Sequence, residues 1–536
     1  MNSNPSERPS VKACQVCNSA RIYYLFSAAG RRVVRCDDCG LVFLNPQPSD
    51  DELARIQNAN CALGSDNEGG RQAAGALKEA AARRYLSEIR RYHGSQSGRL
   101  LEVGCGEGGF LVSAEAVGWQ VTGVEFSPVA GKRARQGLKN GEVWTGSLQQ
   151  AGLAAGQFDL CVVFDVIEHV RSPLGFLQEI HRVLKPGGTL LIATPSLDSW
   201  HARTMRQKGM QFRVEPLTYF DRQTIQTALF KSGFREIIVQ DASENPEFPS
   251  AGGTMIFSRK TELRPQPVLS VIVPAFNEVK TFGVLMEALL CKDVAGLQME
   301  IVVVESNSTD GTREAALKYR GHPKVKLILE EQPRGKGHAV RNGFKAASGD
   351  YVLIQDADLE YDLEDYDALL EHLVAGRSAF VLGSRHGGRN VLKMRQFTGQ
   401  LGLSLFLNFG HWFFAALINV LFFQRLLDPF TMFKVFRRDC LSGLEFECNR
   451  FDFDFELLIK LIRKGYCPVE LPVNYRSRSF KEGKKVRMFR DPLTWLVTLV
   501  RLRCVKIDPM KVIEQKHHAG RVATESGVAK DNNTQI

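Results

Sequence analysis

Two stretches of this chain begin as short apolar runs and end abruptly in polar residues, and this pattern constrains the fold most. The first run, residues 100–103, leads into Gly104-Cys105-Gly106-Glu107-Gly108. The second, residues 351–354, leads into Gln355-Asp356-Ala357-Asp358. Each run is long enough for one buried parallel strand, and open α/β sheets bind ligands at the carboxyl ends of their strands. Because the two signatures differ chemically, we expect two different α/β domains rather than a duplicated one.

The size and charge of the chain agree with several domains. Its 536 residues are too many for one ordinary core. The net charge is +10, and residues 476–511 contain eleven Lys or Arg against three Asp or Glu. No helix-turn-helix or RNA-recognition pattern accompanies this charge, so phosphates or anionic lipid head groups are the favoured partners rather than nucleic acid. The first ten residues contain no apolar core, which predicts no signal peptide, and twelve cysteines without such a segment predict a reducing, cytoplasmic location.

Four cysteines near the start have the spacing of a metal site. Cys14 and Cys17 form one CxxC pair, and Cys36 and Cys39 form a second after eighteen residues. Each pair makes a tight turn that can aim two thiolates at one tetrahedral ion, so we predict structural zinc. The alternative is an unmetallated pair of turns. Between the pairs, residues 22–26 and 33–35 predict a hairpin that turns at residues 29–30.

Strand and helix patterns alternate between residues 99 and 192. The strand 99–103 feeds the glycine turn, and a second strand ends in Glu125 about twenty residues later, where an acid can accept two ribose hydroxyls. These glycines alone would fit NAD equally well. More specific are the buried strand 158–164 with the polar segment 165–169 behind it, and the turn 184–188 that opens another strand.

Together these residues resemble the class I S-adenosylmethionine-dependent methyltransferases over about residues 77–257, and residues 35–46 resemble the zinc-binding leader of one branch of them. The resemblance implies a Rossmann-like domain in which the glycines border the methionine part of the cofactor, Glu125 holds the ribose and the backbone at 147–148 meets the adenine. An acid is usual at the adenine position, where this chain has Ser147. The implied cofactor-binding residues are Glu102, Gly104, Gly106, Gly108, Glu125, Ser147 and Leu148.

Glu168 and His169 would face the substrate pocket of this domain. His169 is the candidate general base, because the unperturbed pKa of histidine lies near working pH. The alternative is that His169 caps or braces the end of the strand. The methyl acceptor is not readable from the sequence.

A second series of strands begins after residue 267. The strand 268–274 leads to Ala275-Phe276-Asn277-Glu278, and the strand 300–304 leads to Glu305-Ser306-Asn307-Ser308-Thr309-Asp310-Gly311-Thr312. A Gly-Lys-Gly loop at 335–337 opens a helix, and the strand 351–354 ends in Asp356 and Asp358. Two carboxylates at this spacing can share one hard cation with a diphosphate, which offsets charge on a leaving nucleotide.

The ordered set, followed by Gly383-Ser384-Arg385, resembles family 2 glycosyltransferases of the GT-A fold over about residues 267–506, especially the dolichyl- or polyprenyl-phosphate mannosyl and glucosyl transferases. The resemblance implies a nucleotide-sugar donor, Mg2+ or Mn2+ and a lipid-phosphate or glycan acceptor. Asp356 and Asp358, with Glu360, would hold the metal, and Asp428 would lie by the acceptor. The implied substrate-binding residues are Pro274, Glu278 and Glu305 at the nucleobase, Lys336 of the Gly-Lys-Gly loop, Arg385 at the acceptor phosphate, and Arg476, Arg478 and Lys484 on a basic loop.

Two departures from that family leave the substrates open. Family members usually have paired aspartates where this chain has Glu305-Ser306, and Ser-Gly-Phe where it has Thr431-Met432-Phe433. A phosphate acceptor is already ionised and needs no strong base. A sugar hydroxyl would need one, and Asp428 is then the candidate.

The most apolar stretch, residues 401–423, is long enough to span a bilayer. A span would separate Asp356 and Asp358 from Asp428 and Arg476, so we expect an interfacial helix over 399–424 and a peripheral protein on the cytoplasmic membrane face. A buried core helix or a dimer face is the alternative.

The predicted organisation is a zinc-ribbon leader (1–50), a methyltransferase domain (51–257), a linker (258–267), a glycosyltransferase domain (268–510) and a disordered tail (511–536). We expect a bifunctional transferase that serves one glycan or glycolipid pathway. The competing hypothesis is a monofunctional glycosyltransferase whose front half only binds or recruits.

Overall fold

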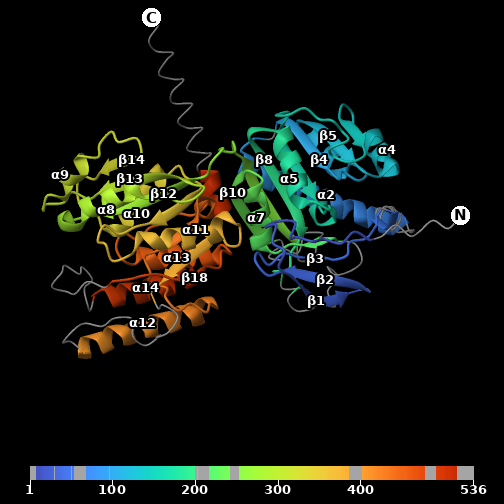
Figure 1. The fold of residues 1–536 in the computed structure, drawn as a ribbon. Helices are drawn as coiled ribbons and strands as arrows, with labels where there is room; N and C mark the ends of the chain where they lie inside the picture. The colour runs from blue at the N-terminus through green and yellow to red at the C-terminus, as the bar shows by residue number, and fades with distance from the viewer. Residues whose placement is uncertain are drawn as a thin grey trace, which may run out of the picture. The chain divides into compact units, whose positions relative to one another are not determined.

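The computed structural model describes residues 8–28, 30–49, 51–53, 68–95, 97–199, 202, 216–241, 253–385, 401–476 and 490–515. The chain divides into two compact units (Figure 1). Unit 1 comprises Met1–Leu263 with Asp508–Ile536, and unit 2 comprises Arg264–Ile507. Both are α/β, as the sequence predicts.

Unit 1 is built on a seven-stranded sheet with the strand order β10-β11-β8-β7-β4-β5-β6. The strand β4 pairs in parallel with both β5 and β7, so their carboxyl ends lie side by side at one edge. Its strands are β4 (Gly98–Val103), β5 (Trp119–Glu125), β6 (Glu142–Thr145), β7 (Phe158–Phe164), β8 (Leu184–Pro195), β10 (Phe234–Asp241) and β11 (Gly253–Lys260). β11 runs antiparallel to both of its neighbours.

The helices of unit 1 cover this sheet and follow the strands along the chain. α3 packs against β5, α4 against β5 and β6, α5 against β8, and α7 against β10. They are α2 (Glu68–His93), α3 (Gly109–Ala116), α4 (Pro128–Gly137), α5 (Pro173–Val183) and α7 (Arg222–Lys231). The core joins fully buried strand residues such as Leu100 and Leu160 to Ile89 and Tyr92 of α2.

A small antiparallel sheet carries the leader. β1 (Ile22–Ala28) and β2 (Arg31–Cys36) form the predicted hairpin, and β3 (Val42–Leu44) follows. β3 pairs in turn with β9 (Thr218–Tyr219), which lies far along the chain. The leader is therefore joined by main-chain hydrogen bonds to the rest of unit 1.

The end of the described chain differs from the predicted disordered tail. Residues 509–515 are helical, and Met510 and Ile513 are buried in the core of unit 1. Arg91 of α2 donates to Glu514 at 3.3 Å. The predicted glycosyltransferase boundary at 510 thus lies three residues beyond the end of unit 2, and residues 516–536 lie outside the described residues.

Unit 2 also contains a seven-stranded sheet, with the order β14-β13-β12-β15-β17-β16-β18. β12 pairs in parallel with β13 and β15, so a second set of strand ends meets at one edge. β17 runs antiparallel to β15 and β16. The strands are β12 (Val268–Ala275), β13 (Gln298–Glu305), β14 (Val325–Leu329), β15 (Tyr351–Ile354), β16 (Phe380–Ser384), β17 (Lys434–Arg437) and β18 (Val469–Pro472).

The helices of unit 2 pack mainly around this sheet. α10 lies on β12 and β13, and α11 lies on β16 and β17. They are α8 (Val279–Cys291), α9 (Thr312–Leu317), α10 (Lys336–Ala346), α11 (Tyr366–Val374), α12 (Leu401–Phe422), α13 (Phe453–Arg463) and α14 (Arg490–Cys504).

The predicted linker 258–267 begins inside the last strand of unit 1, because β11 continues to Lys260.

The helix α12 is apolar on two faces. Phe414 and Ile418 are buried in the core of unit 2, where Phe414 meets Trp495 of α14, and Ala415 is also buried. Phe409 and Val420 face outward and are each 71% exposed. No helix in the described part of the chain is both long enough and apolar enough to cross a membrane.

Candidate functional site

The glycine turn of unit 1 is organised by Glu125. Its Oε2 accepts a hydrogen bond from the Gly106 N–H, and its Oε1 accepts one from the Ser127 N–H, both at 2.8 Å. A carboxylate has about four lone-pair positions, so Glu125 can still accept ribose hydroxyls. Each of the three turn glycines has a positive φ, and a Cβ on Gly104 would come within 2.3 Å of Val166. A Cβ on Gly106 would meet open space.

The other predicted cofactor residues lie at the same edge. Glu102 in β4 is buried, its Oε2 has no hydrogen-bond partner among the described residues, and burial together with the charge of Glu125 raises its pKa well above the usual range. Ser147 follows β6, where its N–H donates to Gln150 and its hydroxyl accepts from the Gln150 N–H. Leu148 is buried. This set fits S-adenosylmethionine, and contact of each residue with the cofactor stays a prediction.

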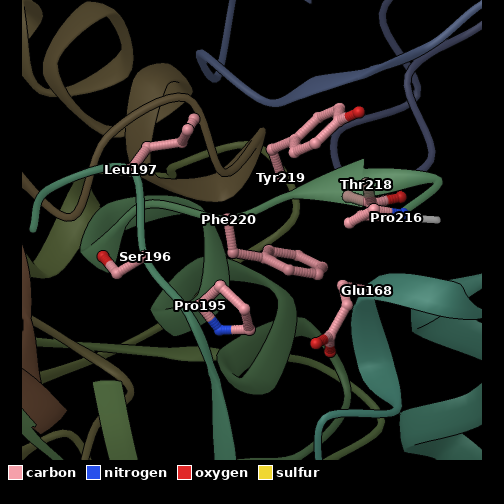
Figure 2. Close-up of a pocket in the computed structure, with 8 residues that line it drawn as sticks. All are labelled: Glu168, Pro195, Ser196, Leu197, Pro216, Thr218, Tyr219 and Phe220. Carbon is pink, nitrogen blue, oxygen red and sulfur yellow. The ribbon is translucent and has the colours of Figure 1, made fainter. Parts of the chain in front are cut away.

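A pocket lies where the chain leaves β7 and β8, and Figure 2 shows the side chains around it. Glu168 lines this pocket together with Pro195, Leu197, Thr218, Tyr219 and Phe220. In the view of Figure 2, the Phe220 ring lies between Pro195 and Glu168. His169, the predicted base, is not among the lining residues, and its Nε2 lies 4.0 Å from Glu168 Oε1.

Glu168, which is buried, and Asp165, which is exposed, are two neighbouring acids that the sequence interpretation did not recognise as a pair. Desolvation by the surrounding chain and the charge of Glu168 raise the pKa of Asp165 to about 7, and burial raises the pKa of Glu168 to about 7. Thr194 donates to Glu168 Oε2 at 3.0 Å. The available signal was that both acids lie directly behind a buried strand. From that segment, the sequence interpretation chose only His169 as the candidate base.

The four predicted zinc ligands come together in the leader. Their Sγ atoms all lie within 4.8 Å of one another, with Cys14 and Cys39 at 3.5 Å and Cys17 and Cys36 at 3.4 Å. Tetrahedral zinc with Zn–S bonds of about 2.3 Å requires Sγ separations of roughly 3.8 Å. The cluster therefore fits a closed zinc site with four protein ligands.

In unit 2, the acids behind β15 contact basic and hydroxyl groups of the chain. Asp356 forms an ion pair with Lys336, the first residue of α10. Burial would lower the pKa of Lys336, but the charges of Asp356 and Asp454 outweigh it and raise the pKa. Asp358 accepts from the Glu360 N–H at 3.2 Å, and Glu360 accepts from the Tyr475 hydroxyl at 2.7 Å. In the described part of the chain, these three acids do not form a cluster of potential metal ligands as the four cysteines do.

The predicted acceptor residues Arg385 and Asp428 contact each other directly. Nε and Nη2 of Arg385 donate to the two carboxylate oxygens of Asp428 at 2.8 and 2.7 Å. Burial alone would raise the pKa of Asp428, but the charge and hydrogen bonds of Arg385 lower it well below the usual range. The Arg385 guanidinium also lies over the Tyr475 ring, 5.2 Å from its centroid. Such a carboxylate is a poor general base.

Among the predicted nucleobase residues, Glu305 is fully buried at the end of β13. Its Oε1 accepts from the Ser308 N–H at 2.6 Å and its Oε2 accepts from Arg313 Nε at 2.5 Å. Pro274 lies in β12, and the Glu278 N–H, at the start of α8, donates to Thr312 at 2.9 Å. Proximity of these residues to a nucleobase stays a prediction.

Glu330 is a residue that the sequence interpretation missed. It follows β14, and its Oε2 accepts from Ser306 at 2.7 Å while its Oε1 accepts from Asn342 at 2.7 Å. His338 Nδ1 lies 2.6 Å from the same Oε1. Ser306 stands where the resembling family usually has a second aspartate, and Glu330 brings a carboxylate to that place from the next strand. An acid directly behind a strand was the available signal.

The basic loop is only partly described. The Arg476 N–H donates to the Glu360 carbonyl oxygen at 2.9 Å, which ties the start of the loop to the segment behind β15. Tyr475 and Tyr361 form an isolated antiparallel bridge beside it. Arg478 and Lys484 lie outside the described residues.

Comparison with known proteins identifies both halves. Residues 77–239 match the family model of a methyltransferase domain, and residues 270–443 match the model of glycosyl transferase family 2. The chain therefore carries one domain of each class, which confirms the predicted fusion.

Two curated relatives and one solved structure illustrate the similarity. A dolichol-phosphate mannosyltransferase from Pyrococcus furiosus is 31% identical over 216 residues, covering 40% of this chain and 58% of the relative. A dolichyl-phosphate beta-glucosyltransferase from Saccharomyces cerevisiae is 28% identical over 255 residues, covering 44% and 74%. A S-adenosylmethionine-dependent methyltransferase from Thermotoga maritima, a possible histamine N-methyltransferase, is 23% identical over 33% of this chain and 94% of its own, with a TM-score of 0.26. The aligned region thus spans little more than half of the first relative.

Proposed function

We propose that unit 2 transfers a sugar, with inversion, from a nucleotide-diphosphate sugar to a polyprenyl phosphate or a related glycan or glycolipid acceptor. The observation that carries this proposal is the pair Asp356 and Asp358 at the carboxyl end of β15, with Lys336 bound to Asp356. Mg2+ or Mn2+ held by these acids would offset the charge that develops on the leaving diphosphate. Lys336 can then exchange its ion pair with Asp356 for one with a phosphate oxygen, because the carboxylate and the phosphate are both anionic.

The acceptor is inferred from the Arg385–Asp428 ion pair. A phosphate nucleophile is already ionised and needs an anchoring cation, which Arg385 supplies. A sugar hydroxyl would need Asp428 to accept a proton, and the lowered pKa of Asp428 works against that. The dolichyl-phosphate glycosyltransferase relatives support the same choice.

Unit 1 is proposed to transfer a methyl group from S-adenosylmethionine. Glu125, the glycine turn and the buried Glu102 form its cofactor site, and the four-cysteine cluster is proposed to hold structural zinc. The alternative is that unit 1 only binds the cofactor or recruits a partner. It would then bind S-adenosylmethionine but would not transfer a methyl group.

Peripheral association with the cytoplasmic face of a membrane is the third part of the proposal. α12 exposes Phe409, Phe413 and Val420, and α14 exposes Leu493 and Val497. The two helices contact each other, and their exposed apolar side chains are the groups that we propose rest at the lipid interface. Arg425 and Arg503 are exposed near the ends of these helices, where they suit anionic head groups.

A panel of radiolabelled nucleotide sugars tests the first part. Full-length protein is incubated with each donor, Mn2+ and extracted membrane lipids, and the organic phase is counted. We expect label in the organic phase with one donor, released by mild acid as a sugar phosphate linkage requires. Label confined to water-soluble glycans would instead support a hydroxyl acceptor.

A further inference from the structure

The inner face of α12 carries two polar side chains that bind the segment following this helix. The carboxamide of Asn419 donates to the Leu426 carbonyl oxygen at 2.9 Å and accepts from the Leu426 N–H at 2.8 Å. The ring Nε2 of His411, which is buried, lies 3.2 Å from the Leu427 carbonyl oxygen. α12 is therefore tied by its side chains to residues 426–428, which we call the connecting segment.

The connecting segment ends in the proposed acceptor site. Glu470 of β18 accepts hydrogen bonds from the Leu427 and Asp428 N–H groups, each at 2.7 Å. Asp428 Oδ2 accepts from the Arg385 main-chain N–H at 2.9 Å, in addition to the two bonds from the guanidinium. Because each residue of the segment is held through its main chain, a shift of α12 is passed on to Asp428 and, with it, to Arg385.

The outer face of the same helix is apolar and exposed. Phe409 and Val420 face outward on α12. Leu427, in the connecting segment itself, is 45% exposed, whereas its neighbour Asp428 is fully buried. A single peptide bond thus joins a residue of the exposed apolar surface to a residue of the buried ion pair.

Phe423, directly after α12, supports a ligand on this face. It is 84% exposed, and its φ of 54° lies in the left-handed region, where the residue after a helix end is usually glycine. A ring that is neither buried nor attached to relaxed backbone contributes little to folding. Arg425, two residues further on, is also exposed. An aromatic ring and a cation at the end of an apolar helix suit an anionic lipid surface, the partner already proposed for α12.

We propose that Asn419 is a positioning residue for sugar transfer, because its two hydrogen bonds pass the position of α12 on lipid to the Arg385–Asp428 pair. The inference rests on the proposed sugar transfer by unit 2 and on its proposed lipid contact through α12. A lipid surface that binds one position of α12 best selects that position, and the connecting segment then directs Arg385 toward the acceptor phosphate. Since the orientation of a bound reactant changes its rate of reaction, lipid contact raises kcat and does more than deliver the acceptor.

The test measures sugar transfer by the full chain to geranyl phosphate, an acceptor that dissolves in water, from the nucleotide sugar that the donor panel selects. Vesicles of phosphatidylglycerol without acceptor are added or left out. At saturating acceptor, we expect the vesicles to raise the wild-type kcat by roughly fivefold or more, the lower end of coupling between two sites. Concentration of the acceptor at the membrane would by itself lower KM and leave kcat unchanged. Glycerol phosphate, the head group in soluble form, should not raise kcat.

Two variants separate the coupling from the lipid contact. Asn419→Leu keeps the approximate size of the side chain but removes both hydrogen bonds, so it should bind vesicles like the wild type without a rise in kcat. Phe423→Gly relaxes the backbone and removes the exposed ring, so it should weaken vesicle binding and the rise together. The matched control is Gln424→Leu, because the Gln424 amide binds the Phe422 carbonyl oxygen rather than the connecting segment. Its kcat should rise as in the wild type.

Hydrogen exchange provides a readout that is independent of turnover. Vesicles should slow exchange at the Leu427 and Asp428 N–H groups in the wild type but not in Asn419→Leu. The inference is overturned if kcat rises equally in the wild type and in a folded Asn419→Leu, or if vesicles change neither kcat nor exchange in the wild type. A kcat that rises with protein concentration instead of with vesicles would also overturn it and would assign the apolar face to a second copy of the chain. A wild type that transfers sugar to no phosphate acceptor would refute the proposed function of unit 2 itself.

Discussion

Arg385 and Asp428 form a buried ion pair in which two nitrogens of the arginine meet the two oxygens of the carboxylate at 2.8 and 2.7 Å. The two residues, predicted separately as acceptor contacts, are therefore partners in one ion pair. Asp428 fixes the direction of the guanidinium, and its own oxygens are occupied. Its main-chain N–H is in turn held by Glu470 at 2.7 Å.

Asp428→Asn should lower sugar transfer and raise KM for the acceptor, because Arg385 loses the partner that orients it. Breaking a buried pair also costs about 3–5 kcal/mol of stability. Asp439→Asn is the matched control, since Arg437 and Asp439 form another buried pair of unit 2. Steady-state kinetics at a temperature where both variants are folded should show the KM effect for Asp428→Asn alone. Equal KM values would assign Asp428 a purely structural role.

Asp356→Asn should reduce sugar transfer by roughly 100-fold or more, the scale on which removal of one preorganised charge-stabilising group acts. Methyl transfer should be unaffected. Asp362→Asn serves as the control, because Asp362 is an exposed cap six residues further on and asparagine caps equally well. Loss of both activities in Asp356→Asn would reveal coupling between the two units.

Met510→Ala should destabilise unit 1, although Met510 follows the whole of unit 2 in the sequence. Truncation of a buried methionine costs about 2–5 kcal/mol, and Met510 is fully buried. Lys511→Ala, at an exposed neighbour, is the control. The thermal transition that S-adenosylhomocysteine shifts should move down only in Met510→Ala. An unchanged transition would mean that residues 508–515 contribute nothing to unit 1.

Glu168→Gln should stabilise unit 1 at high pH. The raised pKa values of Asp165 and Glu168 mean that the folded state binds more protons than the unfolded state between about pH 4 and 7, so the free energy of unfolding falls as pH rises through that range. The gain in Tm over the wild type should therefore be larger at about pH 8 than at about pH 5.

Glu115→Gln is the control of opposite sign for this pH effect. Backbone N–H groups of Lys139 and Asn140 lower the pKa of Glu115, so its substitution should cost stability at neutral pH and cost nothing in acid. A Tm difference between Glu168→Gln and the wild type that did not vary with pH would contradict the raised pKa.

Phe409→Ser combined with Phe413→Ser should weaken binding to vesicles of phosphatidylglycerol, because both rings are exposed on α12. Leu317→Ser combined with Val374→Ser removes exposed apolar side chains of α9 and α11 and is the control. Co-sedimentation should decrease only for the α12 variant. Equal sedimentation of all three proteins would exclude α12 as the lipid contact.

Strand ends were the most predictable part of the molecule. Glu125 ends β5, and Asp356 and Asp358 follow β15, so all three lie at the carboxyl ends of parallel strands, as expected. The clustering of the four cysteines was equally predictable, since two CxxC turns can share a metal ion in few ways.

Contacts between distant segments could not be predicted. Glu330 reaches Ser306 only because β14 lies beside β13, and Met510 enters unit 1 only because the chain returns after about 240 residues of unit 2. The pairing of β3 with β9 likewise joins two short strands that carry no periodic signal. His169 was preferred to Glu168 because its ordinary pKa suits catalysis, whereas burial is what shifts the pKa of the acid.

The central claim, two transferase sites in one chain, is tested most directly by a double-label experiment. Full-length protein is given tritium-labelled S-adenosylmethionine, a carbon-14-labelled nucleotide sugar and membrane extract, and both labels are followed in the products. We predict that the wild type incorporates both labels, that Asp356→Asn loses only the sugar label, and that Glu125→Ala loses only the methyl label. If the wild-type chain binds both S-adenosylmethionine and the nucleotide sugar but incorporates only one label, the account is contradicted.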